Sequence, residues 1–200
     1  MEIGLTYNLR EEACAYPGAP PDFAAEFDTE ESIGYLVDAL TELGHHVRRI
    51  GNLRQLMDFL RAGQGETLDL VFNMAEGTWG RAREAQVPAL LEAYRVPYTG
   101  ADPLTLSLCL DKAMAKRIWQ QAGVATAPFA VISEAAALAD DFVDHIGLPD
   151  FPLFVKPLHE GTSKGIDAAS VVASVSALRE RVEWTLARYD QPALVEAFLP

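Results

Sequence analysis

The sequence predicts an α/β fold with a first domain on a parallel sheet and a second α/β domain after it. Short β-like runs alternate with longer runs of helical periodicity, which is the pattern of βαβ units. Half of the 200 residues are hydrophobic, so the chain can bury one or two cores. Neither a repeat nor a low-complexity tract interrupts this pattern.

Composition excludes several classes of protein. The formal net charge of −13 argues against sequence-independent binding to nucleic acid or to anionic membranes, both of which need clustered basic residues. A signal peptide and an apolar run long enough to span a bilayer are both absent, so we expect a cytosolic protein. We expect neither a structural disulfide nor a zinc site, because the two cysteines and four histidines lack metal-ligand spacing: Cys14, Cys109, His45, His46, His145 and His159.

The first elements alternate strand and helix. A strand is expected over 2–8, and a Pro-rich loop follows it. A helix from Asp28 carries a capping box with Glu31 and ends at Gly44. Its buried face is predicted to contain Ile33, Leu36, Val37, Leu40 and Leu43. Further elements are a strand over 46–50, a helix over 53–63, a buried strand over 68–75 and a helix over 83–95.

The segment 97–103 reads as a strand end that turns into a loop, and we place the domain boundary near residue 103. The second domain is then 104–200. Its expected elements are a helix over 110–123, a strand over 129–132, an Ala-rich helix from Glu134, a strand over 151–157, a helix over 175–189 and a strand over 192–199.

Lysine is confined to two segments, although arginine is spread along the chain. Of the 16 lysines and arginines, the lysines are Lys112, Lys116, Lys156 and Lys164. Lys156 precedes a proline and should therefore be extended at its strand end. The following turn, 159–165, offers glycines and hydroxyls that can surround a phosphate, to which lysine adds a compact charge. The alternative for this turn is an ordinary solvated hairpin, which is what such a turn between two strands usually is. The turn does not have the spacing of a Walker A loop.

Lys112 and Lys116 share one face of a predicted helix at its first turn. Cations there oppose the helix dipole, and a bound anion would relieve that conflict. An ordinary amphipathic helix, with Asp111 offsetting the charge, is the alternative.

Four segments resemble an ATP-grasp ligase in their order and spacing, and most closely the D-alanyl-D-alanine ligase group. They are 71–77, 83–129, 154–166 and 194–199. The resemblance is close over 69–200 and holds in outline over 1–68. It implies a Rossmann-like pre-ATP-grasp domain over 1–103 and the central subdomain of an ATP-grasp fold over 104–200, with the C-terminal lobe missing.

The resemblance implies that the chain binds ATP with Mg²⁺. Lys112 and Lys156 are similar to lysines that contact the phosphates, Glu196 to a carboxylate beside the adenine amine, and backbone near Phe198 and Leu199 to groups that pair with the ring. The turn that folds over the phosphates corresponds to Glu160, Gly161, Thr162, Ser163 and Gly165. An exposed carboxylate on an edge strand is the alternative for Glu196.

The family's reaction has two steps: ATP phosphorylates a carboxylate, and an amine then displaces the acyl phosphate. The family's metal ligands and catalytic arginine have no counterpart in this sequence, so we assign no metal ligand or catalytic residue. We expect the 200-residue chain alone to be inactive in ligation.

The substrate region departs from the family pattern. Glu76, Arg81, Arg83 and Glu84 stand where the first substrate binds in the family. Glu76 could bind an amino group and Arg83 a carboxylate, and both could instead be surface charges. An amino acid or peptide is expected as substrate, and screening amines for ATP-dependent phosphate release would separate D-alanine from other amines. A non-catalytic nucleotide-binding module is a further alternative, and a homodimer stays open.

Overall fold

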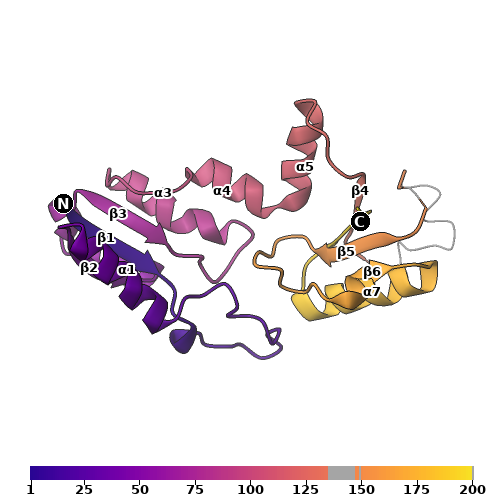
Figure 1. Cartoon of the computed structure of the whole chain (residues 1–200), viewed down its shortest axis with the longest axis horizontal. Coiled ribbons are helices and arrows are strands. Elements are labelled where there is room, and N and C mark those ends of the chain that lie inside the picture. Colours follow the sequence, from indigo (N-terminus) through magenta and orange to yellow (C-terminus); the bar gives the residue numbers. More distant parts are fainter. Residues whose placement is uncertain (135–146, 149, 200) are drawn as a thin grey trace. The chain divides into compact units, whose positions relative to one another are not determined.

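The chain divides into two compact units in the computed structural model, which describes residues 1–134, 147–148 and 150–199 (Figure 1). The first unit comprises 1–14 and 24–108, and the second comprises 15–23 and 109–200. The division falls after Leu108 rather than near residue 103. The reason is a helix that the sequence analysis did not predict, α4 (Pro103–Leu110), which continues the chain beyond the loop.

A three-stranded parallel sheet forms the centre of the first unit, with the strand order β2-β1-β3. The strands are β1 (Glu2–Tyr7), β2 (His46–Gly51) and β3 (Leu70–Met74). β1 and β3 coincide with apolar runs in the sequence, as expected for strands that helices cover on both faces, whereas the edge strand β2 carries the exposed Arg48 and Arg49. The predicted parallel sheet is therefore confirmed.

Helices cover both faces of this sheet. Because successive side chains of a strand point to opposite faces, Val71 packs in the core formed with α2 (Leu53–Arg61) and α3 (Gln86–Ala93). Its neighbour Phe72 packs in the core formed with α1 (Glu30–Glu42). The first unit thus has three layers.

The start of α1 differs from the predicted capping box. The N-cap is Thr29, whose side chain accepts a hydrogen bond of 3.1 Å from the amide of Ser32. Asp28 instead forms a parallel bridge with Leu9, which holds its backbone extended one residue before the helix begins. The pairing of Asp28 with Glu31 as a capping box is therefore wrong.

Two further helix ends refine the prediction. Gly44 follows α1 with φ +85°, which confirms it as the stop. Leu43 is 73% exposed and does not join the buried face, because the helix has already ended at Glu42.

The helix expected over 83–95 is shorter in the structure, since its first residues form a 3-10 turn before α3. The 3-10 helices are η1 (Arg10–Glu12), η2 (Gln64–Thr67), η3 (Arg83–Ala85) and η5 (Ala168–Ser170).

The second unit contains a four-stranded antiparallel sheet with the order β4-β7-β5-β6. Its strands are β4 (Phe129–Ile132), β5 (Leu153–Pro157), β6 (Val171–Val172) and β7 (Ala193–Ala197). Apolar runs predicted β4, β5 and β7. The two-residue β6 is too short to leave such a signal.

Two helices lie on opposite faces of the antiparallel sheet. α7 (Val175–Tyr189) runs along one face of the sheet (Figure 1). It contributes Leu178 and Val182 to the core that contains Val155 and Val195. The other face meets α5 (Lys112–Gln121) in a smaller core. Because the pleat alternates, the residues next to Val155 and Val195 must face α5.

Two predicted features, a helix and a histidine, fall on residues that the structure does not describe. The Ala-rich helix predicted from Glu134 onward and His145 lie outside the described residues. Among the helices that are described, none combines the length and apolarity needed to cross a membrane. Cys14 and Cys109 are both free and exposed.

Candidate nucleotide-binding site

The register of the antiparallel sheet brings two charged residues together on the face toward α5. β5 and β7 pair Phe154 with Glu196 and Lys156 with Leu194. Lys156 and Glu196 are therefore diagonal neighbours on one face, within reach of long side chains. Lys156 Nζ lies 2.5 Å from Glu196 Oε1.

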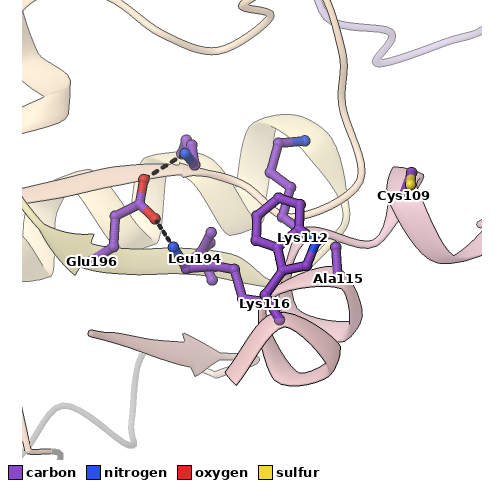
Figure 2. Close-up of a pocket in the computed structure, with 8 residues that line it drawn as sticks. Cys109, Lys112, Ala115, Lys116, Leu194 and Glu196 are labelled. Atoms are coloured by element: carbon purple, nitrogen blue, oxygen red, sulfur yellow. Dashed lines mark hydrogen bonds and ion pairs between the residues drawn. The ribbon is translucent and has the colours of Figure 1, made fainter. Parts of the chain in front are cut away.

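Lys116 reaches the same carboxylate from α5. Its Nζ lies 2.9 Å from Glu196 Oε2 and donates to Thr126 Oγ1 at 2.8 Å, so each oxygen of Glu196 meets one lysine (Figure 2). Burial acts to raise the pKa of Glu196, but the hydrogen bonds and charges of Lys156 and Lys116 outweigh it and lower the pKa. Glu196 is therefore ionised at neutral pH and is not an exposed edge-strand carboxylate.

Lys112 and Lys116 lie about one turn apart on α5, which begins directly after its N-cap Asp111. The Asp111 carboxylate accepts hydrogen bonds of 3.0 Å from the amides of Ala113 and Met114, which fixes where the helix begins. Lys112 Nζ donates to the carbonyl oxygen of Glu160. Lys112 thus contacts the start of the glycine-bearing turn that follows β5.

Glu160 gathers further partners at the start of the turn. Lys164 forms an ion pair with Glu160 Oε2, and Gln191 donates to Glu160 Oε1 at 2.7 Å. Thr162 and Ser163 form the tip, where both are exposed with φ values of 45° and 57°. Consecutive residues in this left-handed conformation are strained for non-glycine side chains, and such outliers cluster at ligand-binding sites.

A cavity of about 250 Å³ opens between α5 and the sheet (Figure 2). The residues that line it are Cys109, Lys112, Ala115, Lys116, Trp119, Lys156, Leu194 and Glu196. Three lysines face one carboxylate there, which leaves an excess of positive charge in a partly apolar pocket. Such a cavity favours an anionic ligand with an apolar or aromatic part.

All four lysines of the chain therefore converge on two glutamates, Glu160 and Glu196. The sequence selects both glutamates, Lys112 and Lys156 as site residues. It places Lys116 beside Lys112 on one helix face and Lys164 within the glycine-bearing turn, but it assigns no contact to either lysine. The i, i+4 spacing of Lys116 to Lys112 was the one available signal for Lys116. Of the other predicted site residues in this unit, Gly161 and Gly165 lie in the turn, Phe198 stacks on Phe154 with ring centroids 6.3 Å apart, and Leu199 is 71% exposed.

The predicted substrate residues lie in the first unit around a buried arginine. Arg83 Nη2 is 3.1 Å from Glu26 Oε2, and the two side chains are only 8% and 3% exposed. Arg83 is therefore not a surface charge. Burial, followed by repulsion from Glu84 and Glu26, raises the pKa of Glu76 to about 7.

We expect Glu76→Gln to stabilise the first unit above pH 7. In the folded chain the pKa of Glu76 is about 7 against an ordinary 4.5, so the unfavourable charge is absent below pH 4.5 and complete above pH 7. The substitution should add about 1 kcal/mol to the free energy of unfolding at about pH 8, after allowance for solvent screening, and little at about pH 4.5. Hydrogen exchange of β1 and β3 amides measures this for the first unit alone.

The exposed Glu66→Gln is the matched control, for which the exchange rates should stay unchanged at both pH values. An equal effect of Glu76→Gln at both pH values would contradict the shifted pKa.

A family model described as the D-ala D-ala ligase C-terminus matches residues 118–200, which carry two of the four contacts between a lysine and a glutamate, Lys156–Glu196 and Lys164–Glu160. Curated D-alanine–D-alanine ligases also match most of the chain. The ligase of Xanthomonas axonopodis pv. citri is 36% identical over 169 residues, which are 83% of this chain and 50% of that protein. The chain is a homologue of the D-alanine–D-alanine ligases. Its wider family is that of the ATP-grasp enzymes.

Another relative places the chain beside a protein without an assigned activity. An uncharacterized protein, y4sG, of Sinorhizobium fredii is 35% identical over 169 residues, covering 82% of this chain and 47% of that protein. This chain therefore spans about half the length of the curated relatives that it matches.

Solved structures show the same fold. The D-alanine–D-alanine ligase of Bacillus anthracis superposes with a TM-score of 0.72 at 22% identity, covering all of this chain and 58% of that one. A second structure of the Bacillus anthracis ligase, in complex with ATP, has a TM-score of 0.64 at 20% identity and covers 59% of that chain. The α/β fold, with one parallel and one antiparallel sheet, is therefore that of D-alanine–D-alanine ligases.

Proposed function

We propose that this chain provides the nucleotide-binding part of an ATP-dependent ligase that joins a carboxylate to an amine, of the D-alanine–D-alanine ligase type. The observation that carries the proposal is the convergence of all four lysines on Glu160 and Glu196, around a cavity and next to a glycine-bearing turn. Homology to the named ligases supports the reaction class.

The residues present fit a nucleoside triphosphate. Lys156 and Lys112 would hold phosphate oxygens, and the exposed tip at Thr162 and Ser163 would close on them with its amides and hydroxyls. Glu196 would accept a hydrogen bond from the amine of the base, with Phe198 beside it. When bound, ATP supplies the phosphoryl group that activates the carboxylate. The lysines would neutralise the charge that develops on that group.

Lys156 has to change partner for this role. In the structure Lys156 is paired with Glu196, which also forms an ion pair with Lys116. If Lys156 turns to a phosphate, Lys116 still compensates the Glu196 carboxylate. Two lysines on one glutamate therefore allow one of them to leave without exposing a buried, unpaired charge.

Magnesium stays an expectation from the family. Among the described residues, no three His, Cys, Asp or Glu side chains are grouped so that they could hold a metal ion. We therefore assign no ligand to magnesium and derive no step through it.

Glu76 supports an amine-bearing substrate at the first unit. It lies near Glu84, Glu26 and Asp28, whose combined charge favours a cation such as an amino group. Arg83, which is paired with Glu26, would bind a substrate carboxylate only by sharing that partner. This distribution is compatible with D-alanine and equally with another amino acid or a peptide. A homodimer and a cytoplasmic location stay part of this proposal.

ATP should protect Cys109 from alkylation and leave Cys14 unprotected. Cys109 lines the cavity beside Lys112 and Lys116, whereas Cys14 belongs to the other unit, and both thiols are exposed. With saturating ATP we expect the rate of maleimide labelling at Cys109 to fall about tenfold or more, because a ligand that fills the cavity covers the thiol. Peptide mass spectrometry measures both cysteines in one sample.

Equal labelling of Cys109 with and without ATP would contradict the nucleotide site. Labelling that slows equally at both cysteines would point to an unspecific effect of ATP on the reagent. Ligation itself is tested in a protein that continues this chain to the length of its relatives, where D-alanine should stimulate phosphate release from ATP. Stimulation by another amine alone would keep the reaction class and change the substrate.

A further inference from the structure

An amino-terminal loop, residues 15–23, belongs to the second unit although the rest of the first 108 residues forms the first. Three prolines limit its backbone freedom, and two tight turns shape it. The amide of Ala19 donates to the Tyr16 carbonyl at 2.9 Å, and the amide of Phe23 donates to the Pro20 carbonyl at 3.0 Å. The loop therefore has backbone hydrogen bonds of its own.

Asp22 connects this loop to the glycine-bearing turn. Its Oδ2 accepts a hydrogen bond of 2.9 Å from the amide of Gly165 and one of 2.7 Å from the hydroxyl of Tyr189. Oδ1 is buried and has no hydrogen-bond partner among the described residues. The half-buried carboxylate of Asp22 thus connects the end of the turn and α7 through one oxygen.

Gly165 is held by hydrogen bonds at both its amide and its carbonyl oxygen. Besides its bond to Asp22, its carbonyl oxygen accepts a hydrogen bond of 2.8 Å from Arg181 Nη2. Its φ of +69° suits glycine, and an added Cβ would lie 2.6 Å from Pro157 and 2.9 Å from Tyr189. The carboxyl-terminal end of the turn is held as firmly as the Glu160 end.

Both ends of the turn are therefore anchored, while its tip is exposed. Thr162 and Ser163 lie between the two anchored ends, and the anchor from Asp22 comes from a segment 143 residues before Gly165. A phosphate-binding turn needs its amides aimed correctly before the ligand arrives, because ordering a loose loop costs binding free energy.

We propose that Asp22 is a positioning residue that holds the glycine-bearing turn in its phosphate-binding geometry, so that the loop 15–23 is part of the nucleotide site. The inference rests on the proposed nucleotide site and extends it to a segment that no sequence signal had connected with it. Asp22 itself touches the turn and α7, and it acts on the nucleotide through Gly165.

Asp22→Ala should weaken binding of ATP and leave binding of adenosine unchanged. The substitution removes the acceptor for two hydrogen bonds, and about 1 kcal/mol each corresponds to roughly a tenfold loss or more. Adenosine has no phosphates and does not depend on the turn. Asp22→Asn keeps an oxygen in place and should retain the affinity for ATP within about threefold. Titration calorimetry measures both ligands on each variant.

A readout without nucleotide separates this inference from the proposed function. In Asp22→Ala the amides of residues 161–165 should exchange hydrogen about tenfold faster, and in Asp22→Asn at nearly the native rate. Tyr189→Phe, which leaves the bond between Asp22 and Gly165 intact, should show a smaller effect on both measurements. The exposed Glu12→Ala is the matched control in the same part of the sequence and should change neither.

The outcomes of these measurements separate the nucleotide site from the positioning role of Asp22. If the native chain binds no ATP, the nucleotide site fails, and the exchange rates still decide whether Asp22 orders the turn. If the native chain binds ATP while Asp22→Ala binds it equally well, or loses adenosine as strongly as ATP, the positioning role is overturned. Tighter binding of ATP by Asp22→Ala would overturn it as well, because the carboxylate would then compete with phosphate for the Gly165 amide.

Discussion

Replacing Lys156 by Met should weaken binding of ATP by about tenfold or more, which corresponds to roughly 1.4 kcal/mol. Lys156 stands at the end of β5, lines the cavity and is the more exposed of the two lysines on Glu196, with 21% of its side chain accessible against 9% for Lys116. It is thus the lysine that can turn to a phosphate. Methionine keeps the length of the side chain and removes the charge.

The fold should survive this substitution, because Lys116 still compensates Glu196. A thermal melt checks that point, and titration calorimetry with ATP and with adenosine checks the affinity. Adenosine binding should change little. Arg117→Met is the matched control, since Arg117 is an exposed cation on α5 outside the cavity lining. Unchanged affinity for ATP in Lys156→Met would remove Lys156 from the site.

Most of the second unit's elements could be predicted from the sequence, whereas the order of its strands could not. The helix over 175–189 carries a clear periodicity with Ser174 as its N-cap, and it forms over the predicted residues. The strand order β4-β7-β5-β6 depends on pairing between segments far apart in the chain. No local pattern encodes that pairing, because an apolar run fits many neighbours equally well.

The meeting of Lys116, Lys156 and Glu196 follows from that strand order. The sequence indicates that Lys156 ends a strand and that Lys116 lies on a helix. Only the register, in which β7 sits between β4 and β5, places Glu196 within reach of both. The resemblance to the ligases selected Glu196 and Lys156 for the site, but it gave no position to Lys116.

Local rules failed where tertiary contacts competed with them. Asp28 has the side chain of a good N-cap, yet its bridge with Leu9 moves the cap to Thr29. A charged residue such as Arg83 is usually expected at the surface. In the structure Arg83 is buried, and Glu26 compensates its charge. Both contacts come from the stretch between β1 and α1, whose sequence predicts only a loop.

Replacing Glu196 by Ala should destabilise the second unit by about 3 kcal/mol at neutral pH, since it leaves a buried lysine without its counterion. The uncompensated charge would be that of Lys116, because only 9% of its side chain is exposed and its other partner, Thr126, is neutral. Hydrogen exchange of β5 and β7 amides measures the loss within this unit. The exposed Glu183→Ala on α7 is the matched control and should stay within about 0.5 kcal/mol of the native chain.

The double variant Lys116→Met with Glu196→Ala tests whether the unpaired charge is the cause. If it is, adding Lys116→Met should recover a large part of the stability that Glu196→Ala loses, because a methionine in that position buries no charge.

The pH dependence of the stability gives an independent check. The lowered pKa of Glu196 means that its stabilisation is present above the ordinary 4.5 and is lost as the pH falls below it. The difference between the native chain and Glu196→Ala should therefore shrink in acid. Additive losses in the double variant, together with a difference that does not change with pH, would mean that Glu196 stabilises the sheet by packing rather than by its charge.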